Sequence, residues 1–158
     1  MSVALRAATT EDAPHVAEVL ISSRKAFLPY APSVHADTEV HRWVREVLIP
    51  SGGVTVACAG AALVGALATA RESNVSWIKQ LYITPSHVGQ GIGSRLLAHA
   101  LASVALPVRL YTFQANARAR SFYERHGFKA IAFTDGSANE ERCPDVLYEL
   151  AASPNAGT

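Results

Sequence analysis

Hydrophobic and polar residues alternate along seven segments of the chain, and hydrophobic residues recur at helical spacing along four others. Alternation over about four to eight residues is typical of strands buried on one face, whereas a spacing of about three to four residues is typical of amphipathic helices. The predicted strands cover residues 2–8, 54–59, 62–70, 76–83, 108–113, 128–133 and 146–150. The predicted helices begin near Thr9, Asp37, Ile92 and Asn116.

Strands outnumber helices in this pattern, and consecutive hairpins flank one strand–helix–strand segment. The sequence therefore predicts an α/β (α+β) fold with a mixed, mostly antiparallel twisted sheet and helices on both faces. With 158 residues, 49% of them hydrophobic, the chain predicts a single domain over residues 1–158 whose last residues, 151–158, form a frayed tail. Gly65, inside the third predicted strand, indicates a bulge or close packing.

The third predicted helix follows the glycine-rich segment Val88-Gly89-Gln90-Gly91-Ile92-Gly93. Glycines at alternate positions leave the main chain bare, and the first N–H groups of a helix have no acceptor within that helix. The helix dipole adds partial positive charge at the same place. The segment therefore predicts a turn that binds a phosphate or pyrophosphate group.

Two other phosphate-binding motifs do not fit this segment. A P-loop requires a Lys after its last glycine, and a dinucleotide-binding turn requires an acidic residue about 20 residues further along the chain. No Asp or Glu occurs from Ser73 to Tyr123, which disfavours a nicotinamide-dependent oxidoreductase. The same span contains five basic residues, namely Lys79, Arg95, Arg109, Arg118 and Arg120. Because the formal net charge of the whole chain is +1, we expect positive charge to be concentrated around the turn.

Together with a second segment, the turn resembles the GNAT superfamily of N-acetyltransferases. Residues 88–93, followed by Ser94-Arg95-Leu96-Leu97, are similar to the family's cofactor motif Q/R-x-x-G-x-G/A. Residues 116–128 are similar to the family's N-x-x-A-x-x-F/Y-Y-x-x-x-G-F segment, and both lie in the family's order and at its usual separation. The resemblance covers residues 2–150. Val88 stands where the family usually has Gln or Arg, so one side-chain contact to the pyrophosphate is missing from the pattern.

The resemblance implies the GNAT fold and acetyl-CoA as the acetyl donor. It also implies that the main chain at the end of a strand bonds the pantetheine arm and the acetyl carbonyl, and that the glycine-rich turn binds the pyrophosphate. Asn116 would bond the cofactor arm, and Tyr123 would act as the general acid for the departing thiolate. Asn116 is also a good N-cap, and Tyr123 is alternatively a core aromatic residue. The implied cofactor-binding residues are Leu81, Tyr82, Ile83, Val88, Gly89, Gln90, Gly91, Ile92, Gly93, Ser94, Asn116 and Tyr123.

The general base is less well defined, because the central predicted strands contain no carboxylate. His41 on the second predicted helix is one candidate, since histidine titrates near neutral pH. The alternatives are water, Glu72 and the acidic loop residues Glu140, Glu141 and Asp145. This loop could attract a cationic amine, although a solvated charge run is its more ordinary role. The predicted catalytic residues are therefore Tyr123 and His41, and no metal ligand is predicted.

Composition narrows the class of protein further. Cys58 and Cys143 lie far apart without a C-x-x-C spacing, which disfavours a disulfide framework and a zinc site. The low net charge disfavours a nucleic-acid partner. The absence of an export signal, and of any apolar stretch of about 18 residues, favours a cytoplasmic protein with no membrane partner.

The predicted function is therefore transfer of an acetyl group from acetyl-CoA to a primary amine, which belongs to a small molecule or to a protein. The alternative is a catalytically weak acyl-CoA-binding sensor or partner module, motivated by Val88 and by the strands without carboxylates. A homodimer is considered as the oligomeric state. No motif identifies the acceptor.

Overall fold

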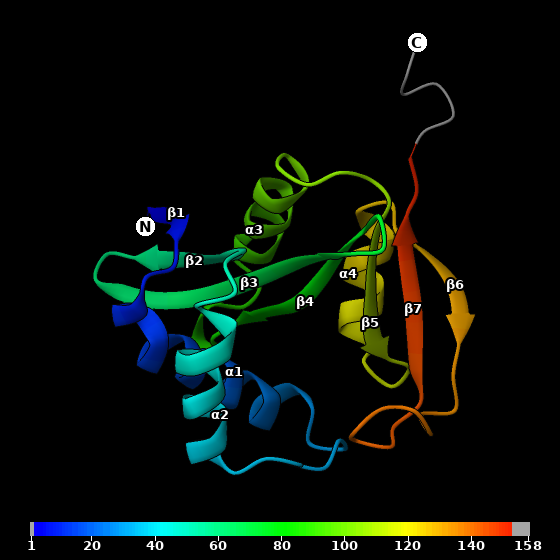
Figure 1. Cartoon of the computed structure of the whole chain (residues 1–158), viewed down its shortest axis with the longest axis horizontal. Helices are drawn as coiled ribbons and strands as arrows, with labels where there is room; N and C mark the ends of the chain where they lie inside the picture. Colours follow the sequence, from blue (N-terminus) through cyan, green and yellow to red (C-terminus); the bar gives the residue numbers. More distant parts are fainter. Residues whose placement is uncertain (1, 153–158) are drawn as a thin grey trace. The chain divides into compact units, whose positions relative to one another are not determined.

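Seven strands are joined by hairpins and helices in the computed structural model, which describes residues 2–152 (Figure 1). The strands are β1 (Val3–Ala7), β2 (Val54–Ala59), β3 (Ala62–Glu72), β4 (Val75–Ile83), β5 (Val108–Phe113), β6 (Lys129–Phe133) and β7 (Asp145–Leu150). The helices are α1 (Ala13–Phe27), α2 (Asp37–Trp43), α3 (Ile92–Leu101) and α4 (Ala117–Arg125). Short helical segments are η1 (Thr10–Asp12), η2 (Val44–Leu48) and η3 (Pro85–His87). Over residues 2–152, no helix has the length and apolar character needed to cross a membrane.

Hydrogen bonds join the strands in the order β1-β2-β3-β4-β5-β7-β6. The β4–β5 pair is parallel, whereas the β1–β2, β2–β3, β5–β7 and β6–β7 pairs are antiparallel. The predicted mixed, mostly antiparallel sheet is therefore confirmed.

Contacts group the chain into two units. The first unit comprises Met1–Thr69 and Lys79–Ser103, and the second comprises Ala70–Ile78 and Val104–Thr158. The single domain stays a prediction. Most of the expected frayed tail, residues 153–158, lies outside the described residues.

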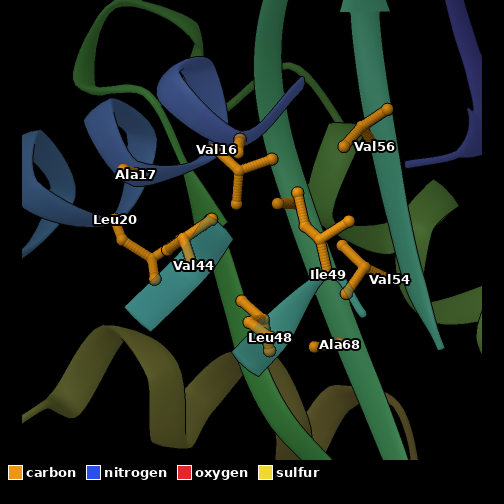
Figure 2. Packing of buried hydrophobic residues seen from close by; sticks show 11 residues of the cluster. Val16, Ala17, Leu20, Val44, Leu48, Ile49, Val54, Val56 and Ala68 are labelled. Carbon is orange, nitrogen blue, oxygen red and sulfur yellow. The ribbon is translucent and has the colours of Figure 1, made fainter. Parts of the chain in front are cut away.

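In the first unit, helices cover both faces of the sheet, with α1 and α2 on one face and α3 on the other (Figure 1). Apolar side chains recur at helical spacing on α1 and meet alternate residues of β2 and β3 (Figure 2). Each of the larger ones contributes about 1.5–3 kcal/mol by leaving water. The buried cluster consists of Ala13, Val16, Ala17, Leu20, Val44, Leu48, Ile49, Val54, Val56, Ala66 and Ala68.

Gly65 on β3 brings the end of β4 close to α3. A Cβ atom at this position would lie 2.8 Å from Ile83 Cδ1 and 3.2 Å from Leu96 Cδ1. The β2–β3 register also shifts here, because Ala57 pairs with Gly65 whereas the next residue of β2 pairs with Leu63. Both the bulge and the close packing indicated by this glycine are confirmed.

In the second unit, β7 pairs with β5 on one side and with β6 on the other. Val108 and Leu110 of β5 are buried on the same face as Tyr148 of β7, and the ring of Tyr148 contacts Tyr123 of α4. Helix α4 ends before Gly127, whose φ of +90° is that of a left-handed helix terminator.

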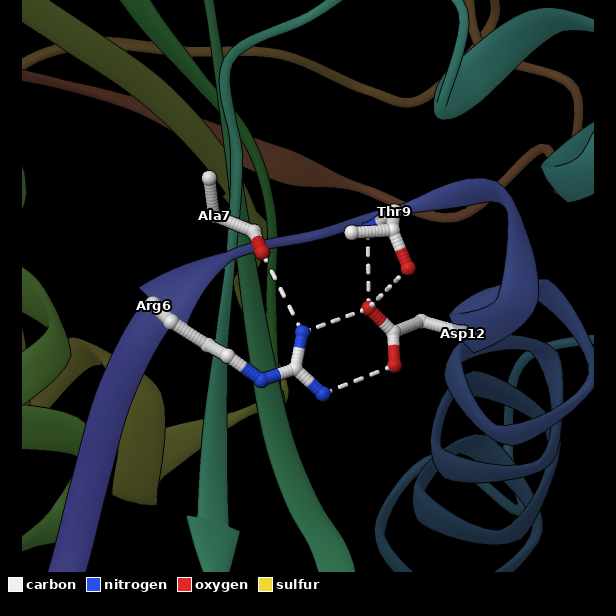
Figure 3. A network of polar contacts seen from close by, with 4 residues as sticks. All are labelled: Arg6, Ala7, Thr9 and Asp12. Atoms are coloured by element: carbon white, nitrogen blue, oxygen red, sulfur yellow. Dashed lines mark hydrogen bonds and ion pairs between the residues drawn. The ribbon is translucent and has the colours of Figure 1, made fainter.

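A nearly buried carboxylate connects β1 to the start of α1 (Figure 3). The Asp12 carboxylate accepts hydrogen bonds from Arg6 Nη1 at 2.7 Å, from Arg6 Nη2 at 2.9 Å and from the main-chain N–H of Thr9 at 2.8 Å. The last bond confirms the predicted helix start between Thr9 and Asp12. The Arg6 guanidinium holds the pKa of Asp12 well below its ordinary value, against the opposite effect of burial.

The Asp12→Asn substitution should lower the free energy of unfolding at pH 7 by about 1–3 kcal/mol, because an amide cannot replace the charge-assisted bonds. Since folding lowers the pKa of Asp12, its contribution is present above the ordinary carboxyl pKa of about 3.9 and is lost as the pH falls towards the folded-state value. Urea denaturation should therefore show a smaller difference between variant and wild type at about pH 3 than at pH 7.

The matched control is Asp37→Asn, which removes an exposed carboxylate that pairs with Lys25 at 3.2 Å. Exposed ion pairs contribute little, so this variant should lose about 0.5 kcal/mol or less. Equal losses in the two variants would contradict the role given to Asp12.

Candidate functional site

Strand β4 is paired with β5 at two positions only. Ser76 pairs with Val108, and Trp77 pairs with Arg109. Among the described residues, no ladder pairing with β5 continues beyond Trp77. The predicted cofactor-binding residues Leu81, Tyr82 and Ile83 lie further along β4 than these two pairs.

A side chain of α1 donates a hydrogen bond to one main-chain group at the end of β4. The Ser23 hydroxyl donates a hydrogen bond of 2.5 Å to the main-chain oxygen of Ile83, and Ser23 is only 2% exposed. Next to it, Arg24 Nη1 lies 3.4 Å from the Tyr82 hydroxyl. Sequence reasoning missed Ser23, because nothing local distinguishes it from the neighbouring Ser22.

The predicted anion-binding turn has the backbone that its glycines allow. After η3, Val88 is extended, and Gly89 and Gly91 have φ values of +78° and +81°. Other residues rarely adopt these angles, and a Cβ atom at either glycine would meet only open space. In the described part of the chain, the N–H groups of Gly89 and Gly91 donate no main-chain hydrogen bond. The turn can therefore offer several main-chain donors to a ligand.

Helix α3 continues directly from this turn. The N–H of Arg95 donates to the oxygen of Gly91 at 3.1 Å, so Gly91 is the N-cap and Ile92, Gly93 and Ser94 form the first turn. Ile92 is buried and fixes the helix start against the core. All predicted pyrophosphate-binding residues thus lie on one short segment, with the positive end of the helix dipole beside them.

Side-chain charge is less concentrated here than the sequence suggests. Arg95 Nη1 donates to the main-chain oxygen of Val3 at 2.5 Å, and in the second unit Arg109 pairs with Glu149 at 2.7 Å. His87 stands just before the turn, where its Nδ1 lies 2.9 Å from the Ser86 hydroxyl. Binding of an anion at the turn would therefore rest mainly on main-chain dipoles.

In the second unit, Asn116 caps α4 as sequence reasoning allowed. Its side-chain oxygen accepts a hydrogen bond from the N–H of Ala119 at 3.1 Å. This bond uses the oxygen and orients the carboxamide, whose NH₂ group is a separate donor. The cap role is therefore confirmed, and a ligand role for the NH₂ group is compatible with it.

Tyr123 lies on the same helix in an aromatic environment. It is 8% exposed, and its ring lies 5.2 Å from Phe122, 5.6 Å from Phe128 and 6.3 Å from Tyr148, measured between ring centroids. The alternative of a core aromatic residue is thus correct for its ring. Such packing fixes the position of the ring and so restricts where its hydroxyl can point.

A buried hydroxyl on β7 hydrogen-bonds to two side chains of α4. The Tyr148 hydroxyl accepts a hydrogen bond from Arg120 Nε at 3.0 Å and donates one to Glu124 Oε2 at 2.6 Å, and Tyr148 is 0% exposed. Burial raises the pKa of Tyr148, and the bond to Glu124 raises it further. The Arg120 guanidinium also lies 5.6 Å from the centre of the Phe133 ring. Sequence reasoning missed this cluster, whose only local signal is a tyrosine at a buried position of a strand.

His41 on α2 forms an ion pair across to α1. Its Nε2 lies 2.8 Å from Glu18 Oε1, and both side chains are partly exposed. A carboxylate beside Nε2 favours the tautomer with its proton on Nε2, which leaves Nδ1 as a proton acceptor. The ion pair between His41 and Glu18 could therefore orient the imidazole. It is also an ordinary surface contact.

Glu140, Glu141 and Asp145, at the end of the loop after β6 and the start of β7, do not form one solvated charge run. Asp145 is buried at the start of β7, where its carboxylate accepts hydrogen bonds from the Thr134 hydroxyl and, at 3.1 Å, from Asn139 Nδ2. The Asn139 side chain also donates a hydrogen bond to the main-chain oxygen of Cys143 and accepts one from the N–H of Cys143. Asp145 thus shapes this loop, which makes it a poor candidate for attracting an amine.

A family model of the acetyltransferase (GNAT) domain matches residues 50–130, just over half of the chain. Comparison with curated proteins gives no match. Apo YjaB from Escherichia coli has a TM-score of 0.76 at 22% identity, over 96% of this chain and 100% of that chain. The PaiA N-acetyltransferase of Thermoplasma acidophilum, in complex with coenzyme A, has a TM-score of 0.75 at 24% identity over the same shares. Arabidopsis thaliana Naa50, in complex with the bisubstrate analogue CoA-Ac-MVNAL, has a TM-score of 0.66 at 20% identity, again over 96% and 100%. These likenesses show that the fold is shared.

The Tyr148→Phe substitution should lower the free energy of unfolding by about 1–3 kcal/mol, because Arg120 and Glu124 lose a buried partner while the ring is kept. Denaturant titration followed by tryptophan fluorescence would measure the loss. Tyr111→Phe is the matched control, since Tyr111 lies on the neighbouring strand and is 54% exposed. Identical denaturation midpoints for both variants would show that the Tyr148 hydroxyl does not stabilise the second unit.

Proposed function

Because the chain belongs to the GNAT acetyltransferases and its acetyl donor is acetyl-CoA, we propose that it is an N-acetyltransferase acting on a primary amine of a small molecule or a protein. The single observation that carries the proposal is the glycine-rich turn, whose main-chain N–H groups are available at the start of α3. We also propose a cytoplasmic location, and a homodimer as the form to test first for its oligomeric state.

The residues of the turn fit the pyrophosphate of the donor. Gly89 and Gly91 have positive φ, and a Cβ atom at either position would meet only open space. Val88 cannot supply the charged contact that is usual in the family, so the main chain of residues 88–93 and the first turn of α3, including Ser94, would carry the binding. The loss of one side-chain contact should weaken affinity without abolishing it.

Acetyl-CoA supplies its acetyl group as an activated thioester. Main-chain groups of Leu81, Tyr82 and Ile83 on β4 would hold the pantetheine arm and orient the acetyl carbonyl. An N–H group aimed at the carbonyl oxygen stabilises the negative charge that develops there during attack. The Asn116 NH₂ group, whose carboxamide is already fixed by the helix cap, would donate to the cofactor arm.

Transfer forms a bond between the amine nitrogen and the acetyl carbon and breaks the bond between that carbon and sulfur. The amine loses a proton to a base, and the departing thiolate gains one from an acid. Tyr123 would be the acid, since a phenol carries a transferable proton and this ring is rigidly packed. His41 would be the base through Nδ1, with Glu18 orienting its ring.

A catalytically weak acyl-CoA-binding sensor is the second candidate. Val88 at the usual Gln or Arg position and the absence of carboxylates on β4 and β5 favour it. A sensor would bind acetyl-CoA and release no thiol with any acceptor. The two functions are therefore separated by turnover and not by binding.

The proposal is tested by thiol release from acetyl-CoA across a panel of amino acids, polyamines, aminoglycosides and peptides. With the acceptor that responds, Tyr123→Phe should lower kcat by about 10²-fold or more, because a general acid typically contributes that much. Its Kd for coenzyme A should stay within about twofold, since one hydroxyl is lost outside the phosphate-binding turn. Tyr111→Phe serves as the control for removing a tyrosine hydroxyl, and an equal kcat in the two variants would exclude Tyr123 as the acid.

The Gly91→Asp substitution should weaken coenzyme A binding by about 10²-fold or more, because it adds a negative charge and strains a main chain with φ of +81°. Isothermal titration calorimetry with coenzyme A measures the effect. The matched control is Gly60→Asp in the β2–β3 turn, where φ is +61° and the Cβ space is equally open. Wild-type affinity in Gly91→Asp would remove the turn from the binding site.

A further inference from the structure

We infer that Ser23 is a positioning residue for the acetyl carbonyl of the donor. Its buried hydroxyl donates a hydrogen bond to the Ile83 oxygen, so the Ile83 N–H is the group that the end of β4 offers to a ligand. The inference rests on the proposed function, in which β4 orients the thioester. Ser23 belongs to neither of the two sequence motifs. It lies on α1, 60 residues before Ile83.

The direction of the Ile83 main chain follows from its neighbour. The N–H of Thr84 donates to the oxygen of Val64 on β3 at 2.8 Å. In a trans peptide the oxygen of Ile83 points opposite to this N–H, and therefore away from β3. In an extended residue the N–H and C=O groups point to the same edge of the strand. Both polar groups of Ile83 thus face the edge of β4 opposite to β3.

The two groups would act in opposite ways on a thioester at this edge. The N–H would stabilise negative charge on the acetyl oxygen, whereas an unpartnered carbonyl oxygen beside it would repel that charge. The Ser23 hydroxyl, at 2.5 Å, directs its proton at this carbonyl oxygen and so reduces the repulsion. It also anchors the peptide between Ile83 and Thr84, whose other end is held by Val64.

The hydroxyl is held in place by the core of the first unit. Val16, Ala17 and Leu20 of α1 are buried in the apolar cluster of Figure 2, and Ser23 follows them one turn later at 2% exposure. A second contact, from Arg24 to the Tyr82 hydroxyl at 3.4 Å, connects the same turn of α1 with β4. A donor on a packed helix needs no reorganisation when charge develops, which is the property that such stabilisation requires.

Ser22 gives a matched control on the same helix turn. Its hydroxyl donates to the Val19 oxygen at 3.3 Å, within α1 itself. Ser22→Ala and Ser23→Ala therefore remove the same atoms from adjacent positions, and only the second removes a bond to β4. Ser23→Thr keeps the hydroxyl and tests whether the hydrogen bond, and not the identity of the residue, is required.

The test uses the carbonyl of bound acetyl-CoA as a local probe, without acceptor. Hydrogen bonding to the thioester oxygen lowers its stretching frequency and shifts its ¹³C resonance downfield from the free value. In Ser23→Ala both signals should move towards those of free acetyl-CoA, and kcat with the responding acceptor should fall about tenfold, less than for loss of a direct donor. The Kd for coenzyme A, which has no acetyl carbonyl, should change by less than about twofold. Ser22→Ala and Ser23→Thr should keep the wild-type carbonyl signals.

Four results would overturn the inference. Carbonyl signals in Ser23→Ala equal to those of the wild type would do so even if kcat fell, because the serine would then only stabilise the fold. Equal effects in Ser22→Ala and Ser23→Ala would assign the change to α1 in general. A wild-type protein that fails to bind acetyl-CoA would remove the proposed function as well, whereas normal wild-type turnover with an unaltered Ser23→Ala would remove this inference alone.

Discussion

A main-chain N–H or C=O group that loses its partner at the edge of a strand or the start of a helix costs free energy unless another group bonds to it. In this chain such groups are collected over one short stretch, from Leu81 to the first turn of α3. The pairs between β4 and β5 end at Trp77, and in the turn that follows β4 the N–H groups of Gly89 and Gly91 donate no main-chain hydrogen bond to a described residue. The packed core of the first unit holds these donors in place.

That support comes from both faces of the sheet in the first unit. On one face, the packed α1 presents Ser23 to the end of β4, and its own start is fixed to β1 by the Asp12 carboxylate. On the other face, Gly65 lets Ile83 and Leu96 approach closely, so that β4 and α3 meet next to the turn. Interiors packed in this way resist small displacements, which is what precise placement of main-chain donors requires.

Much of this arrangement could be predicted because it is local in sequence. The strand limits follow from the alternation of hydrophobic and polar residues, and the turn follows from glycines at alternate positions. The helix end at Gly127 and the helix start at Thr9 follow from rules that involve a few adjacent residues. Ser23 and Tyr148 could not be predicted, because their partners lie 60 residues away for Ser23 and 24 to 28 for Tyr148. Their roles depend on which face of an element meets which neighbour, and periodicity alone does not decide that.

The number of basic residues in the sequence overstates the free positive charge near the turn for a related reason. The stretch without acidic residues suggests a concentration of free cations, yet Arg109 is neutralised by Glu149 from β7 and Arg95 is directed to the oxygen of Val3. Such partners enter only when the chain is folded. Since Val88 also lacks a polar side chain, the proposed attraction for an anion at this turn would come chiefly from oriented peptide dipoles, which salt screens less than exposed charges when the ligand is held in direct contact. Such contact would depend on the backbone angles of Gly89 and Gly91, and the glycines would then take the place of the charged side chain that the family usually has at the position of Val88.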